Sequence, residues 1–172
     1  MLRSSDGVHV PISDGDPAFP LVASAVCLLT EGMSDATVLV LGATGKAGRR
    51  ITPRLRLRGL TVRAASRNSA TPFDWSDPGG WDAALRGADA VYIVPPAVPG
   101  PVHQLVDRAV AAGVQRLVLQ SGHGADVWGD TSFGQDMLSA EQAVRTSDLE
   151  WTVCCERRTS TRTSTRSSGT PP

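Results

Sequence analysis

The stretch Thr37-Val-Leu-Val-Leu-Gly-Ala-Thr-Gly-Lys-Ala-Gly48 joins an apolar strand pattern to a glycine-rich turn, and a helical pattern follows at once. Glycines let the backbone turn tightly and approach a ligand. The first N–H groups of a helix lack partners within it, and the helix dipole favours an anion there. The order strand, glycine turn, helix therefore predicts a nucleotide phosphate site. The alternative is an ordinary strand-turn-helix corner of an α/β protein.

The predicted phosphate contacts lie within this loop. They are Gly42, Thr44, Gly45, Lys46 and Gly48. The Lys46 side chain either adds positive charge near the phosphates or is simply solvated.

A length of 172 residues is typical of one domain with a substantial core. Seventeen basic residues balance seventeen acidic ones, so the overall charge gives no reason to expect binding to nucleic acid or a membrane. Three cysteines cannot build a disulfide framework, which favours a reducing, cytoplasmic location. No cluster suggests a metal site.

Residues 1–32 differ from the rest of the chain. They carry one Arg and four acids, and their apolar run, Phe19 to Leu29, is too short to span a bilayer. Met33 lies just before the first strand. We interpret residues 1–32 as a poorly ordered extension or a start-site error, and residues 33–153 as the folded domain.

Strand and helix patterns alternate through that domain. Such alternation predicts an α/β fold with a doubly wound parallel sheet, Rossmann-like. Strands are expected at Thr37–Leu41, Leu60–Ser66, Phe73–Trp75, Ala90–Val94, Val114–Gln120 and Glu150–Val153. Helices are expected at Lys46–Arg58, Trp81–Arg86, Val102–Ala112 and Phe133–Thr146.

Ligands of such sheets bind beyond the carboxyl ends of the strands. Ser66 and Arg67 end the second strand, where NAD-binding proteins usually place an acidic residue. A guanidinium beside a hydroxyl suits a 2′-phosphate, so we expect NADP(H) rather than NAD(H), unless Arg67 is only a solvated strand end. Asp74 is placed to accept from the adenine amino group. Val94, Pro95 and Ser121 are expected to flank the nicotinamide.

Several of these segments together resemble the NmrA-like proteins, atypical members of the short-chain dehydrogenase/reductase superfamily. The resemblance covers residues 36–153 and implies NAD(P) at the glycine loop. The family includes NADP(H)-dependent reductases and cofactor-binding regulators. The matching segments are Gly42–Gly48, Arg63-Ala-Ala-Ser-Arg67, Phe73-Asp-Trp-Ser-Asp77, Ala90-Val-Tyr-Ile-Val-Pro-Pro96, Ala111-Ala-Gly-Val-Gln-Arg116 and Leu149-Glu-Trp-Thr-Val153.

The superfamily's catalytic Tyr-x-x-x-Lys pair has no counterpart here. Phe133 and Met137 align with that Tyr and Lys, and the only Tyr and Lys of the chain are Tyr92 and Lys46. Standard short-chain dehydrogenase catalysis is therefore not expected. His123 could donate a proton, although a lone His in a Gly-rich loop is more often a surface residue.

The last residues, 154–172, change to a Ser/Thr/Arg-rich composition, which predicts a disordered tail. Because family members are longer, we hypothesise a frameshift after Val153 and a truncated C-terminal part. DNA sequencing of codons 150–172 tests this hypothesis. If the neighbouring reading frame cannot encode a family-like continuation, the frameshift is excluded.

Three functions follow as hypotheses. The chain is a cofactor-occupancy sensor that regulates a protein partner, an NAD(P)H-dependent reductase of a small carbonyl or quinone substrate, or an inactive truncated remnant.

Overall fold

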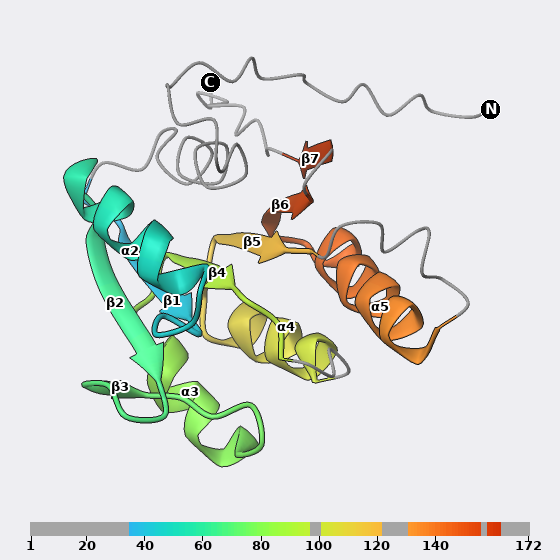
Figure 1. The fold of residues 1–172 in the computed structure, drawn as a ribbon, viewed down its shortest axis with the longest axis horizontal. Helices are drawn as coiled ribbons and strands as arrows, with labels where there is room; N and C mark the ends of the chain where they lie inside the picture. The colour runs from blue at the N-terminus through green and yellow to red at the C-terminus, as the bar shows by residue number, and fades with distance from the viewer. Residues whose placement is uncertain (1–34, 97–100, 122–130, 156–157, 163–172) are drawn as a thin grey trace, which may run out of the picture.

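A computed structural model describes residues 35–96, 101–121, 131–155 and 158–162 of the chain. Within them, seven strands form one sheet in the order β3-β2-β1-β4-β5-β6-β7 (Figure 1). All neighbouring pairs are parallel except β6 and β7, which are antiparallel. The strands are β1 Thr37–Leu41, β2 Thr61–Ser66, β3 Thr71–Pro72, β4 Ala90–Ile93, β5 Arg116–Gln120, β6 Glu150–Cys155 and β7 Arg158–Arg162.

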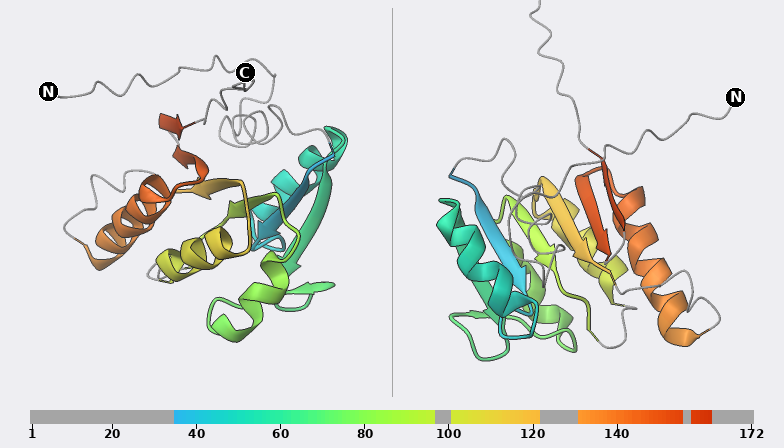
Figure 2. Two further views of the ribbon diagram at one scale, coloured as in Figure 1. Left: turned by 180° about the vertical axis from the view of Figure 1, so that it is seen from behind. Right: turned by 45° about the horizontal axis from the view of Figure 1, so that its top comes forward.

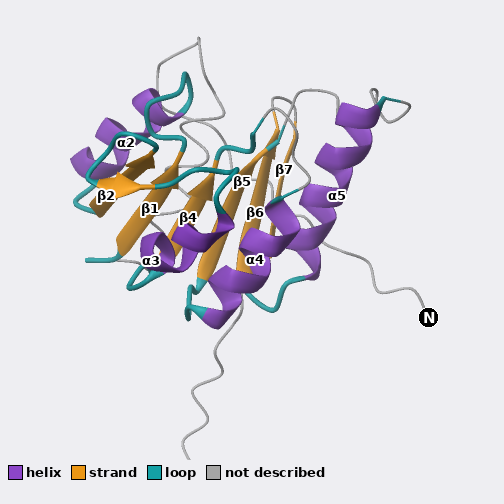
Figure 3. Cartoon of the chain, turned by 90° about the horizontal axis from the view of Figure 1, so that it is seen from below, coloured by secondary structure: helices purple, strands orange, loops and turns teal. Residues whose placement is uncertain are grey.

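Helices cover both faces of this sheet, which confirms the doubly wound α/β prediction. One face carries α3 (Trp81–Leu85), α4 (Val102–Ala111) and α5 (Ser132–Thr146), and α4 and α5 pack side by side (Figures 2 and 3). The other face carries α2 (Gly48–Leu57), which contacts β1 and β2. A short 3-10 helix, η1 (Pro78–Gly80), leads into α3. None of the helices in the described ranges is both long and apolar enough to cross a membrane.

The central strands are buried on both sides because helices lie on both sides. Leu39, Leu41 and Leu117 belong to the core under α3, α4 and α5. Val40 and Val118 belong to the core on the α2 side. This burial explains why the strands read as continuous apolar runs instead of alternating patterns.

The segment Phe73–Trp75 is not a strand, contrary to the sequence prediction. The short pairing with β2 ends at Pro72, and the rings of Phe73, Trp75 and Trp81 then pack together, with centroids 5.1–5.9 Å apart. Burial of three aromatic rings outweighs one more residue of strand pairing. The prediction also began the first helix two residues early, at Lys46, because Lys46 and Ala47 belong to the glycine loop.

The end of the chain also corrects a prediction. We expected disorder after Val153, whereas β6 continues through Cys155, and β7 pairs with it from Cys155↔Arg158 to Trp151↔Arg162. The β7 sequence contains no apolar residue, so backbone hydrogen bonds to β6 account for this edge strand. Thr, which occurs twice in β7, also favours strands. Residues 156–157 and 163–172 lie outside the described residues.

Candidate functional site

The glycine loop lies at the switch point of the sheet, where β1 runs between β2 and β4. Gly42 directly follows β1 and has φ +71°, a conformation that L side chains rarely adopt. A Cβ added at Gly42 would lie 3.2 Å from the Cβ of Val94, at the end of β4. Two of the predicted contact residues, from neighbouring strands, are therefore brought together at the crevice where doubly wound folds bind their ligands.

Backbone donors at the start of α2 are available to a ligand. The Gly45 N–H donates to Gly42 O at 2.9 Å, and the Arg49 N–H donates to Gly45 O at 3.0 Å. Between these bonds, the N–H groups of Lys46, Ala47 and Gly48 find no acceptor in the described parts of the chain. Because α2 has no acidic residue in its first turn, no carboxylate there competes with a bound anion for these N–H groups.

Gly48 allows the first turn of α2 to pack directly on the loop. A Cβ at Gly48 would lie 2.7 Å from the carbonyl carbon of Ala43 and closer still to Gly42 O and Ala43 Cα. All three are backbone atoms, which cannot swing aside as a flexible side chain can. This cradle fits a dinucleotide: the helix start is held against the strand end, and its free N–H groups line the turn.

Ser66 and Arg67 lie at the end of β2, beside this loop, and the Ala43 N–H donates to Ala65 O at 3.1 Å. Ser66 Oγ is buried and has no hydrogen-bond partner within the described structure. The Arg67 side chain is exposed. A buried hydroxyl without a partner is uncommon, and a ligand oxygen would satisfy it.

Asp74 follows Phe73 on the same side of the site. Its Oδ1 accepts from the Ser76 N–H at 2.9 Å and from Ser76 Oγ at 2.7 Å, and these bonds, with the charge of Arg67, hold the pKa of Asp74 below its usual value. Its backbone carbonyl accepts from Trp81 Nε1 at 2.7 Å. The carboxylate is therefore ionised, held in place and close to Arg67.

Ser121 directly follows β5, and its side chain points to α5. Its Oγ donates to Glu141 in a short hydrogen bond, and Glu141 is also paired with Arg145 at 2.7 Å. Both Ser121 and Glu141 are buried. The Ser121 hydroxyl is thus already committed to Glu141, a partner that our sequence analysis did not assign. Only the position of Glu141 on the inner face of a helix could have indicated it.

We expect Glu141→Ala to lower the free energy of unfolding by about 1–3 kcal/mol, because it leaves the buried Ser121 hydroxyl without its acceptor. Glu141→Gln keeps an amide oxygen for Ser121 and loses only the half-exposed pair with Arg145, so its cost should stay below about 1 kcal/mol. Urea denaturation of both variants measures the difference. Equal stabilities of the two would mean that the hydrogen bond to Ser121 contributes nothing.

Tyr92 is buried in β4, and its hydroxyl donates to Gln120 Oε1 at 3.0 Å. Burial, and secondarily Cys154, raises the pKa of Tyr92 above its usual range.

Phe133 is exposed on α5, whereas Met137 is buried. His123 lies outside the described residues.

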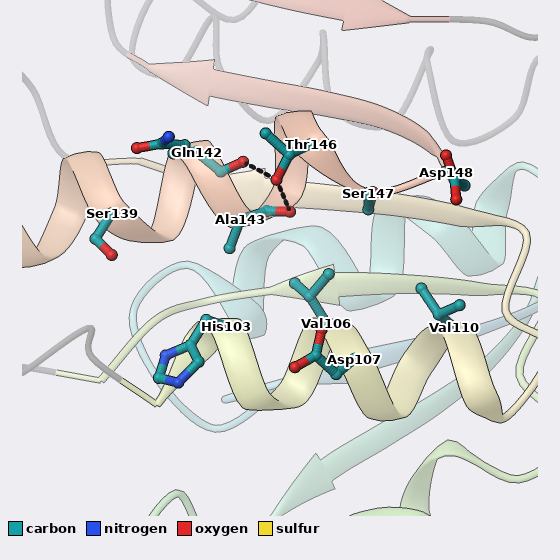
Figure 4. Close-up of a pocket in the computed structure, with 10 residues that line it drawn as sticks. All are labelled: His103, Val106, Asp107, Val110, Ser139, Gln142, Ala143, Thr146, Ser147 and Asp148. Atoms are coloured by element: carbon teal, nitrogen blue, oxygen red, sulfur yellow. Dashed lines mark hydrogen bonds between the residues drawn. The ribbon is translucent and has the colours of Figure 1, made fainter.

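A separate open groove of about 580 Å³ runs between α4 and α5 (Figure 4). Its lining includes His103 and Asp107 of α4 and Gln142 and Thr146 of α5. The Thr146 hydroxyl donates to Gln142 O at 2.9 Å within its own helix. None of the predicted contact residues lines this groove, so it is distinct from the glycine-loop site. Within the described ranges, no three potential metal ligands gather anywhere.

Comparison with known proteins agrees with this geometry. A family model described as NAD(P)H-binding matches residues 42–167. The chain is 30% identical over 130 residues to the NAD(P)H azoreductase of Xenophilus azovorans, covering 67% of the chain and 46% of the azoreductase. It is 34% identical over 129 residues to the (4-alkanoyl-5-oxo-2,5-dihydrofuran-3-yl)methyl phosphate reductase of Streptomyces griseus, covering 67% and 45%. The chain spans about half the length of the curated relatives it matches.

Solved structures share the fold at lower identity. A short-chain dehydrogenase/reductase superfamily protein from Agrobacterium tumefaciens with bound NAD has a TM-score of 0.58 at 23% identity, covering 68% of this chain and 48% of its own. NmrA, a negative transcriptional regulator in complex with NADP, has a TM-score of 0.57 at 21% identity, covering 70% and 45%. With the Rossmann-like sheet, the glycine loop and the family match, the chain belongs to the NAD(P)H-binding family.

Proposed function

We propose that the chain binds NADP(H) in preference to NAD(H), with the pyrophosphate on the glycine loop. The observation that carries the dinucleotide site is the set of N–H groups of Lys46, Ala47 and Gly48, which have no acceptor in the described structure and lie where the Gly48 cradle holds α2 against the end of β1. Gly42, Gly45 and the Thr44 hydroxyl complete the loop, and the Lys46 ammonium adds positive charge.

In this proposal Ser66 and Arg67 bind the 2′-phosphate. The buried Ser66 Oγ lacks a partner in the described residues, and the exposed Arg67 guanidinium can form charge-assisted hydrogen bonds with phosphate oxygens. Asp74 accepts from the adenine amino group with the oxygen that Ser76 does not use. Val94 and Pro95 flank the nicotinamide end of the site. Ser121 also borders that end, because it directly follows β5, but its hydroxyl is already bonded to Glu141.

Thermal melts of the full chain with NADPH and with NADH test the cofactor preference. NADPH at about one hundred times its dissociation constant should add about 2.7 kcal/mol and raise the Tm by roughly 5–10 °C. Arg67→Ala should weaken NADPH binding about 10- to 100-fold, since a hydrogen bond to a charged group contributes about 1.5–3 kcal/mol, and leave NADH binding unchanged.

The matched control is Arg86→Ala. Arg86 is also exposed, but it lies between α3 and the start of β4, toward the amino ends of the strands and away from the proposed site. The Arg86→Ala variant should bind NADPH as the parent does. An Arg67→Ala variant that loses NADPH and NADH equally would assign Arg67 to the fold and not to the 2′-phosphate.

Catalysis by the superfamily's Tyr–Lys pair does not belong to this proposal. Bound nicotinamide supplies a hydride, and a reductase must also supply a proton. Tyr92 holds its proton in a hydrogen bond to Gln120 inside the sheet, and its raised pKa opposes release. Phe133 and Met137 carry no transferable proton. These residues favour a protein that senses cofactor occupancy and signals it to a protein partner.

Reduction of a small carbonyl, quinone or azo substrate is the second candidate, favoured by relatives that are named as reductases. Oxidation of NADPH followed at 340 nm with a panel of such substrates separates the two functions. A sensor gives no turnover at any substrate concentration. If the chain shows neither a cooperative melt nor a cofactor-dependent shift, it is an inactive remnant.

A further inference from the structure

The face of the sheet that α2 occupies is covered by described residues over only half of its width. The α2 helix contacts β1 and β2, at one side of the sheet, whereas α3, α4 and α5 all lie on the opposite face (Figures 1 and 3). Tyr92 of β4, Val118 of β5 and Cys154 of β6 point to the α2 side, in the same core as Val40. No helix in the described part of the chain lies over β5 and β6 on that side.

These side chains are nevertheless shielded from solvent. Tyr92 is 2% exposed, Val118 0% and Cys154 1%. A helix is about 10 Å across, and β6 lies three strand spacings of about 4.8 Å from β1, so α2 cannot cover Cys154. Another apolar segment is needed to account for the burial of this half of the face.

We propose that the apolar segment Phe19–Leu29 of the same chain covers the β4–β6 half of this face. Only seven residues separate Leu29 from β1. At about 3.3 Å per residue they span up to roughly 23 Å, more than the roughly 14 Å from β1 to β6. The segment contains Phe19, Leu21, Val22, Val26, Leu28 and Leu29, enough apolar surface for a sheet face of this kind.

Charge complementarity supports the same occupant. Residues 1–32 carry four acids and one Arg, whereas Gly48–Arg58 holds five arginines and no acidic residue. An N-terminal segment lying beside α2 would bring these opposite charges together. In this proposal Phe19–Leu29 is part of the folded domain.

Protection of the Cys154 thiol reports whether this face is covered. In a Cys27→Ala/Cys155→Ser background, Cys154 is the only thiol of the full chain, and it should react slowly with a disulfide reagent. Val26→Asp/Leu28→Asp should speed the reaction about tenfold or more, the factor given by a loss of about 1.4 kcal/mol in opening free energy. The matched control Val8→Asp/Val10→Asp adds the same charges outside the apolar run and should leave the rate unchanged.

Photo-crosslinking keeps the test decisive if the aspartates unfold the chain. With p-benzoylphenylalanine in place of Leu28, we expect a crosslink within one chain to β4, β5 or β6, located by peptide mass spectrometry. Crosslinks to α3–α5, or between two chains, would overturn the proposal, and the latter would assign the face to a second copy. An unchanged rate in a folded Val26→Asp/Leu28→Asp variant would overturn it too. None of these measurements uses a cofactor, so they are independent of NADP(H) binding.

Discussion

Trp81→Ala should lower the free energy of unfolding by about 3–5 kcal/mol, the range for an aromatic residue removed from a core. Trp81 is fully buried at the start of α3. Its ring packs against Phe73 and Trp75 at centroid distances of 5.9 and 5.7 Å, and the Arg108 guanidinium lies 5.7 Å from its centre. Alanine removes all of these contacts at once.

The hydrogen bond from Trp81 Nε1 to Asp74 O adds a functional consequence. Asp74 stands at the proposed adenine end of the site, and losing this bond frees its backbone. Trp81→Phe keeps most of the ring packing and loses only the bond, so it should cost about 1–2 kcal/mol. Urea denaturation followed by far-UV circular dichroism measures both variants. A Trp81→Ala protein within 1 kcal/mol of the parent would show that the three-ring cluster does not support the domain.

Gly48→Ala should abolish binding of the dinucleotide and lower the free energy of unfolding by about 3 kcal/mol, since the new methyl meets backbone atoms that cannot move aside. The Cβ would lie 2.7 Å from the Ala43 carbonyl carbon, so the start of α2 must shift away from β1. That shift misplaces the N–H groups of Lys46 and Ala47. We expect the Tm to fall by roughly 6–12 °C and the NADPH-induced shift to vanish.

Gly80→Ala is the matched control. Gly80 lies immediately before α3, as Gly48 lies at the start of α2, but a Cβ at Gly80 would come no closer than 3.7 Å to Asp77 Oδ2, an ordinary contact. This variant should keep its stability within about 0.5 kcal/mol and bind NADPH as the parent does. Equal NADPH shifts in the Gly48→Ala and Gly80→Ala proteins would remove the glycine loop from the site.

The fold around the candidate site was predictable because its signals are local. The apolar run Thr37–Leu41, the turn at Gly42 and the helix that follows are neighbours in the chain, and each carries its own pattern. The alternation of strand and helix then restricts the topology, since parallel strands need right-handed crossovers. The carboxyl ends of β1, β2, β4 and β5 meet at one edge as a consequence, which is where the candidate residues were expected.

Pairings between distant elements escaped prediction because they depend on which side chains meet. Glu141 reaches Ser121 across 20 positions of sequence, and Trp81 reaches Asp74 only because the chain leaves the sheet after Pro72. The β6–β7 ladder was missed for a related reason: a polar segment has no core-facing pattern, and its pairing rests on backbone bonds to a neighbour.

The sequence alone therefore determined the fold class, the glycine loop and the family, because short-range pattern and glycine placement encode them. Only the tertiary structure decided that Gly48 tolerates no Cβ, that the Ser121 hydroxyl is committed to Glu141, and that Ser66 Oγ lies buried without a partner among the described residues. The physical reason is that crowding and hydrogen-bond satisfaction are properties of the atoms that surround a residue, and folding brings those atoms together from separate parts of the chain.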